Sequence, residues 1–197
     1  MNWWTSEPVV YTNSDYDGHR VRLLIAEKRA RIATRIRDID EFPESLTEVN
    51  TEGVYPILVD KNLVCYGAAL DELIHERFPS PTLLPIDPVK RAQVRMLDAR
   101  VRSWYRVSDK QLCLNLREEV EDWYNQTPTF YITGNVMSIV DVALAPLLYE
   151  ATQLGLFTPT GPFTDYIERV QSRPSFAQSL RSSTPAAPEE ELNDEAA

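Results

Sequence analysis

Four prolines within ten residues divide this chain into two parts of different design. They stand at positions 79, 81, 85 and 88. Each proline removes a backbone donor and disfavours helix in the residue before it, so this segment is the best domain boundary in the chain. We therefore predict an N-terminal domain over residues 1–79, a proline-rich linker over 80–87 and a C-terminal domain over 88–181.

The N-terminal domain alternates short β-rich runs with runs of helical spacing. Asp17 is the expected N-cap of the first helix, and the two β-rich runs 56–59 and 63–66 predict a hairpin. A β-α-β start needs a parallel pair and the hairpin is antiparallel, so we expect a mixed sheet. In chain order, the expected elements are a strand at 9–11, a helix at 17–25, a strand at 32–38, a helical turn at 44–49, strands at 56–59 and 63–66, and a helix at 70–78.

The C-terminal domain shows helical spacing throughout. Apolar residues at 94, 97, 101 and 104 predict one long helix that begins near Pro88. Its other face is basic, which indicates either a solvated face or one that pairs with acids of a partner subunit. Further helices are expected over residues 112–124, 138–155 and 166–176.

Ser138 and Asp141 stand directly before the apolar run 142–149. The serine hydroxyl can accept from an amide of the first helical turn, and the Asp141 carboxylate can reach back to the amide of Ser138. This pattern predicts a capping box that opens a buried helix. Replacing Asp141 with alanine is therefore predicted to cost about 0.5–2 kcal/mol.

The charge of the chain excludes one broad class of function and is unevenly spread. The formal net charge is −10, so a phosphate backbone is repelled and direct nucleic-acid binding is not expected. Residues 182–197 hold five acids and no base, with one large apolar residue. We predict a disordered acidic tail there, with a solubilising or an interaction role.

The remaining composition argues against several other kinds of site. Cys65 and Cys113 lie far apart in no metal-like or redox spacing, and both are expected to be core thiols. His19 and His75 each lack a nearby second ligand, so no metal is expected; His75 and Asp71 suggest an exposed pair. The start of the chain lacks the pattern of a signal peptide and no apolar stretch is long enough for a bilayer. A cytoplasmic protein is the default expectation.

The order of elements and several strings resemble a known group of proteins. A β-α-β-α-β-β-α domain followed by helices resembles the glutathione S-transferase superfamily, and within it the strings resemble the stringent starvation protein A family. The strings lie at 19–28, 56–60, 75–85, 138–148 and 153–155. The resemblance implies an α/β plus all-α architecture: a thioredoxin-like N-terminal domain with a mixed sheet and a helical C-terminal domain, together the glutathione S-transferase fold.

The same resemblance implies a function. Members of the family are dimeric, non-enzymatic transcription regulators that associate with the RNA polymerase holoenzyme and its sigma factor under starvation or stress. It implies no cofactor, and a dimer with itself or with a paralogous subunit. The alternative is a glutathione transferase or a glutathione-binding protein.

The glutathione alternative depends on a site at one end of the sheet. Thr12, Ser14 and Tyr16 are the hydroxyls that could stabilise a thiolate, and Ser14 is the candidate retained. Asp15 and Asp17 beside it would make a thiolate less stable. The resemblance places a cis-proline at Pro56, after Tyr55, and a carboxylate clamp at Gly67 and Ala68, where this chain has no hydroxyl. These residues therefore predict a vestigial glutathione site.

The regulator alternative depends on the linker. The resemblance associates a proline-rich pocket around the linker with polymerase contact, and Pro79, Ser80 and Pro81 match its outline. The family usually has histidine where this chain has Ser80 and an aromatic residue where it has Asp87. A stiff linker with no binding role is the other interpretation of these prolines.

Overall fold

The computed structural model describes residues 7–36, 50, 53–61 and 63–180. Four strands in this part of the chain form one mixed sheet, in the order β2-β1-β3-β4. Strand β1 runs parallel to β2 and antiparallel to β3, and β3 and β4 form the predicted hairpin. The strands are β1 (Val9–Thr12), β2 (Ala33–Ile36), β3 (Ile57–Asp60) and β4 (Leu63–Tyr66).

Two helices belong to the sheet domain, α1 (Tyr16–Glu27) and α3 (Ala68–Arg77). The prediction of Asp17 as the N-cap of α1 was wrong. The cap is Asp15, whose carboxylate accepts from the Gly18 amide at 2.8 Å. Asp17 lies two residues further on, in the first turn of α1, and pairs with Arg20 instead. The helical turn expected over 44–49 and the acidic tail over 182–197 lie outside the described residues.

The second part of the chain is helical, as predicted. The run expected over 112–124 is one longer helical stretch, 109–126, with a π-helical middle that the apolar spacing did not reveal. The elements are α4 (Pro88–Ser103), η2 (Trp104–Arg106), α5 (Asp109–Leu114), η3 (Asn115–Glu121), α6 (Asp122–Gln126), α7 (Ile139–Gln153), α8 (Pro162–Gln171) and α9 (Pro174–Leu180). The linker that precedes them contains no helix or strand.

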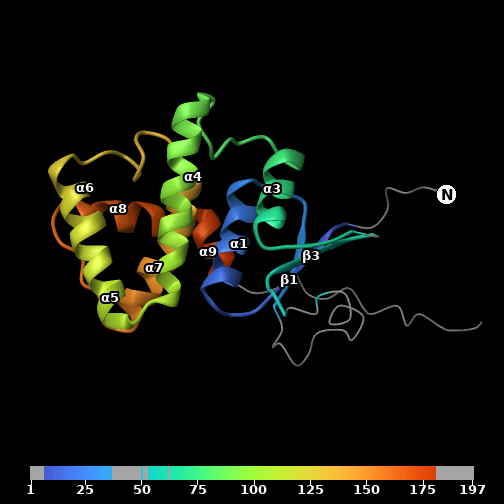
Figure 1. Cartoon of the computed structure of the whole chain (residues 1–197), viewed down its shortest axis with the longest axis horizontal. Coiled ribbons are helices and arrows are strands. Elements are labelled where there is room, and N and C mark those ends of the chain that lie inside the picture. The colour runs from blue at the N-terminus through green and yellow to red at the C-terminus, as the bar shows by residue number, and fades with distance from the viewer. Residues whose placement is uncertain (1–6, 37–49, 51–52, 62, 181–197) are drawn as a thin grey trace, which may run out of the picture.

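Helix α7 is the centre of the core. It is buried from Ile139 to Leu148, and the predicted capping box at Ser138 and Asp141 opens it. Helices α4 and α1 both pack on α7, and α9 returns to lie against α1. Figure 1 shows α1 and α9 between the sheet and the helical part. The two parts of the chain therefore share one continuous apolar core.

Two further side chains differ from expectation. Cys65 is a buried core thiol as predicted, but Cys113 is half-buried and its Sγ donates to the carbonyl of Leu156 at 3.0 Å. Asp71 does not pair with His75 on the surface. It is buried and binds two arginines, Arg20 and Arg102, because helices α1 and α4 bring them to it.

Candidate functional site

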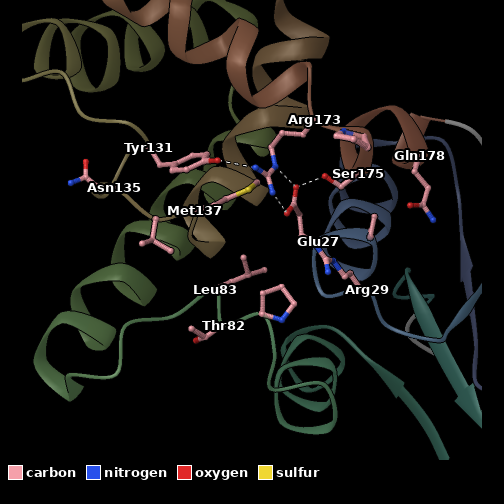
Figure 2. Close-up of a pocket in the computed structure, with 14 residues that line it drawn as sticks. Glu27, Arg29, Thr82, Leu83, Tyr131, Asn135, Met137, Arg173, Ser175 and Gln178 are labelled. Atoms are coloured by element: carbon pink, nitrogen blue, oxygen red, sulfur yellow. Dashed lines mark hydrogen bonds and ion pairs between the residues drawn. The ribbon is translucent and has the colours of Figure 1, made fainter.

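A pocket of about 510 Å³ opens where the linker meets both parts of the fold. We call it the linker pocket. Its walls come from the end of α1, from the linker residues Pro81, Thr82 and Leu83, from the loop before α7 and from the start of α9. Figure 2 shows Leu83 and Thr82 on one side and Arg173 and Ser175 on the other. Residues from four separate segments are therefore needed to form it.

The floor of the linker pocket is a closed polar network. The buried Glu27 carboxylate receives two bonds from the Arg173 guanidinium, each 2.7 Å long, and a third from the Ser175 hydroxyl. Arg173 also donates to the Tyr131 hydroxyl at 2.8 Å. The hydrogen bonds to the Glu27 carboxylate raise the pKa of Arg173, so the Arg173 guanidinium is a cation at neutral pH. The network joins α1 to the segment that opens α9, and its members are already satisfied (Figure 2).

Hydrogen bonds from other parts of the chain hold the linker residues that line the pocket. The buried Lys28 ammonium donates to the Pro81 carbonyl at 3.0 Å, and the Ile139 amide donates to the Leu83 carbonyl, also at 3.0 Å. Between them the Thr82 hydroxyl donates to the Leu84 carbonyl at 2.7 Å. With its carbonyls engaged on both sides, the segment 81–84 is a preformed wall.

The predicted partner-binding residues divide into two groups. Pro81 lines the linker pocket, whereas Pro79 and Ser80 are exposed and do not line it. Asp87 serves as the N-cap of α4, where its carboxylate accepts from the Lys90 amide at 2.8 Å. A capping role explains an acidic residue at this position without any partner.

Two residues of the predicted glutathione site, Pro56 and Gly67, meet beside Thr12 at one end of the sheet. Tyr11 pairs with Ile57 and Ile57 with Tyr66, so the next residues, Thr12, Pro56 and Gly67, come together there. The Tyr55–Pro56 peptide bond is cis, as expected. Gly67 has a φ of 63° and caps α3 without a side-chain bond, and Ala68 is exposed. No side-chain hydroxyl is present at this helix start.

Ser14 is the one of the three candidate hydroxyls that remains available. The Thr12 hydroxyl is buried and accepts from Arg22 at 2.9 Å, and the buried Tyr16 hydroxyl donates to the Ala143 carbonyl at 3.0 Å. Ser14 is exposed and lines a second pocket of about 380 Å³ between the sheet domain and α7. Ala68 lines a different and smaller pocket, so the structure does not bring the two together.

The charges around Ser14 are mixed. Asp15 and Glu150 line the same pocket, and burial together with the charge of Asp15 raises the pKa of Glu150. Arg22 also lines it; burial lowers the pKa of Arg22 to about 10, so it remains a cation at neutral pH. Arg22 is a feature that the sequence analysis missed, because nothing in its neighbourhood along the chain distinguishes it from a surface arginine.

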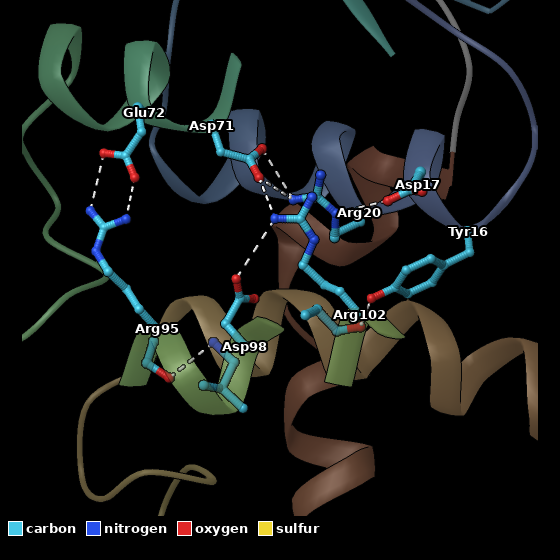
Figure 3. Close-up of polar contacts among 11 residues, drawn as sticks. Tyr16, Asp17, Arg20, Asp71, Glu72, Arg95, Asp98 and Arg102 are labelled. Carbon is cyan, nitrogen blue, oxygen red and sulfur yellow. Dashed lines mark hydrogen bonds and ion pairs between the residues drawn. The ribbon is translucent and has the colours of Figure 1, made fainter. Parts of the chain in front are cut away.

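A buried ion cluster joins α3 to α4. Asp71 accepts from Arg20 at 3.0 Å and from Arg102 at 2.8 Å, and Glu72 on the same helix pairs with Arg95 (Figure 3). Burial raises the pKa of Asp98, which lies 3.8 Å from Arg102, to about 6. Burial disfavours the charged form of Arg20, but the negative charge of Asp71 raises the pKa of Arg20 above its usual value. The basic face of α4 is therefore paired in part with acids of the same chain, which neither sequence interpretation foresaw.

No metal or membrane feature appears in the part of the chain that the structure describes. Its His, Cys, Asp and Glu side chains form no cluster of three that could hold a metal ion. Of the described helices, none has the length and apolar character needed to cross a bilayer.

Comparison with known proteins gives relatives of two kinds. The chain is 37% identical over 183 residues to the stringent starvation protein A homolog of Histophilus somni, covering 85% of this chain and 86% of that protein. It is 25% identical over 181 residues to a probable maleylacetoacetate isomerase of Caenorhabditis elegans, covering 80% and 85%. No family model matches the chain.

The fold is that of a glutathione S-transferase. The crystal structure of such an enzyme from Rhodospirillum rubrum superposes with a TM-score of 0.75 at 23% identity, covering 90% of this chain and 94% of that one. At this identity the likeness establishes the architecture alone.

Proposed function

This chain belongs to the stringent starvation protein A family, and from that premise we propose that it is a non-enzymatic transcription regulator of the cytoplasm. In this proposal it binds the RNA polymerase holoenzyme with its sigma factor and changes gene expression in starvation or stress. The observation that carries the proposal is the linker pocket. It is preformed and its wall contains Pro81, where the family resemblance places polymerase contact.

The rim of the linker pocket supports a binding role over a catalytic one. The titratable groups of its floor, Glu27 and Arg173, are bound to each other and unavailable for proton transfer to a substrate. Val136 on the rim is an apolar side chain that remains 69% exposed. An exposed apolar side chain beside a preformed pocket fits a surface that a partner covers.

We expect the variant Val136→Asp to reduce co-purification with RNA polymerase by about tenfold, since it places a charge where a partner would bury an apolar group. The measurement is a pull-down of the tagged full chain from lysate, probed for polymerase and sigma subunits. Val89→Asp is the matched control, because Val89 is 66% exposed on α4 and does not line the pocket. Equal polymerase recovery with both variants would contradict a role of the pocket.

A glutathione-dependent enzyme is the second candidate. Two observations favour it: the pocket beside Ser14, and relatives named as maleylacetoacetate isomerases. Against it stand the missing hydroxyl at Gly67 and Ala68 and the acids Asp15 and Glu150 in the same pocket. We therefore give the regulator the preference.

We expect no conjugation of glutathione to a general electrophilic substrate, and a glutathione affinity no better than roughly millimolar. One millimolar glutathione would then raise the free energy of unfolding by a few tenths of a kcal/mol at most, up to about 0.4 kcal/mol. A spectrophotometric assay and thermal unfolding measure the two quantities. Conjugation that disappears in Ser14→Ala, with Ser172→Ala as an exposed-serine control, would reverse the preference.

We also propose that the chain dimerises, with itself or with a paralogous subunit. The resemblance to the glutathione S-transferase superfamily implies a dimer in which α4 of one subunit packs on the sheet domain of the other. Here, however, Arg95 and Arg102 of α4 are already paired within one chain. We therefore expect a dimer at micromolar concentration. Its affinity should fall less with added salt than it would if the arginines of α4 were unpaired. Sedimentation velocity of the purified chain measures this, and a monomer at low salt would exclude the homodimer.

A further inference from the structure

The linker pocket continues into a neighbouring pocket on each side. An apolar pocket of about 300 Å³ shares Thr82, Leu83, Asn135, Val136 and Met137 with it. A polar pocket of about 330 Å³ shares Ala26, Arg29 and Gln178. We call the three together the linker groove. Its two ends differ in chemistry, and this difference restricts what it can bind.

The polar end of the groove is positive. The charged side chains that line the three pockets are Arg22, Arg29, Arg173 and Glu27, three bases and one acid in a chain of net charge −10. Arg173 and Glu27 neutralise each other. The bonds of Arg22 go to the Thr12 hydroxyl and to two backbone carbonyls, none of which cancels its charge. The charge of Asp15 acts on Arg22, but Asp15 lines the pocket beside Ser14 and none of the three pockets of the groove.

Arg29 is the exposed cation of this end. It follows α1 with a φ of 50°, and its guanidinium has no hydrogen bond or ion pair with a described residue. It lines both the linker pocket and the polar pocket, so a ligand in either one meets it. Figure 2 shows Arg29 beside Glu27 at the end of α1. An unpaired, exposed arginine at the junction of two pockets suits a carboxylate, which it can bind with two parallel bonds.

The other end of the groove is apolar. None of the residues that line the apolar pocket is charged. Ile86 is 86% exposed on its rim and Val136 lies between it and the linker pocket. The rim between the two ends carries the exposed side chain of Asn135, which can donate to and accept from a peptide backbone. The Thr82 hydroxyl on the same rim already donates to Leu84, so toward a peptide it can only accept.

We propose that the linker groove binds an extended peptide segment of a partner protein in which acidic residues stand beside a large apolar residue. The acidic side chains lie at the Arg29 end and the apolar one lies against Ile86 and Val136. This inference rests on the proposed function, since it states the chemistry of the segment that the regulator recognises. The support for this proposal is charge complementarity, because the positive end of the groove stands on an otherwise acidic protein and attracts acidic side chains. A basic peptide would be repelled by both Arg22 and Arg29.

Selection from a phage library of random twelve-residue peptides on the immobilised full chain tests the chemistry. The expected result is a set of peptides enriched in Asp and Glu together with Leu, Ile or Phe, which the Arg29→Glu variant does not retain. A set without excess acid, a set that Arg29→Glu retains equally well, or no specific peptide at all would overturn the proposal.

The most enriched peptide then serves as a fluorescent probe for affinity. We expect Arg29→Glu to weaken its binding by about tenfold or more, and Lys110→Glu, the same charge change at an exposed site of α5, to change it by less than about twofold. A variant that ends at Arg181 tests the rival occupant, the acidic segment 182–197 of this chain. A gain of about tenfold on its removal would assign the groove to that segment and overturn the assignment to a partner.

The outcome for the peptide is separable from the outcome for polymerase. Polymerase recovery that Val136→Asp reduces, with no acidic peptide selected, would retain the proposed function and reject the proposed chemistry. Acidic peptides that depend on Arg29, with no polymerase recovered, would retain the groove as a peptide site and reject polymerase as the partner.

Discussion

Replacing Asp141 with alanine is expected to lower the free energy of unfolding by about 3–5 kcal/mol, because it leaves several buried donors without a partner. The Asp141 carboxylate is fully buried and accepts from the amides of Ser138 and Ile132 at 2.8 and 2.9 Å. The hydroxyls of Ser138 and Tyr166 donate to it as well, each at 3.0 Å. Burial raises the pKa of Asp141 and these donors lower it, so the net rise is smaller than burial alone would produce.

This loss exceeds the 0.5–2 kcal/mol or so that a capping box alone accounts for. Urea denaturation at neutral pH gives the change in unfolding free energy. Asp165→Ala is the matched control: Asp165 also stands in the first turn of a helix, α8, but it is exposed, so we expect a change of less than about 1 kcal/mol. A loss below about 1 kcal/mol for Asp141→Ala as well would show that the four bonds contribute little.

Replacing Asp71 with alanine is expected to cost about 3–5 kcal/mol, since it leaves a buried arginine without its main counter-charge. The Arg20 side chain is only 6% exposed and binds Asp71 through both carboxylate oxygens. Arg102 from α4 binds the same carboxylate, so one substitution breaks the contact between α3 and both arginines. Asp17 at 3.3 Å from Arg20 compensates only in part.

Glu72→Ala provides a control on the adjacent position. Glu72 also pairs with an arginine of α4, Arg95, but both side chains are 42% exposed, so we expect a loss of less than about 1 kcal/mol. Urea denaturation of the two variants measures the contrast. The double variant Arg20→Met/Asp71→Leu is expected to recover part of the loss, because it removes the unpaired charge. Equal losses for Asp71→Ala and Glu72→Ala would contradict the role of burial.

Local patterns in the sequence were sufficient for the elements of the fold. The hairpin 57–66, the capping box at Ser138 and Asp141, and the break at the prolines each depend on residues a few positions apart. Turn chemistry, capping and side-chain period act over such distances, so they can be recognised without the structure. The cap of α1 was misplaced by two residues, because Asp15 and Asp17 are equally good caps until the backbone selects one.

The linker groove and the buried charges depend on the tertiary structure. Glu27 and Arg173 are 146 residues apart, and Asp71 is 31 residues from Arg102. Whether a charged side chain is solvated or buried, and which opposite charge it meets, is decided only when helices from distant parts of the chain pack together. The family could be recognised from strings of neighbouring residues, and the binding role predicted for Pro81 stays a prediction. Arg22 and Arg29 became part of one groove only through the packing of α1 against α9 and the linker.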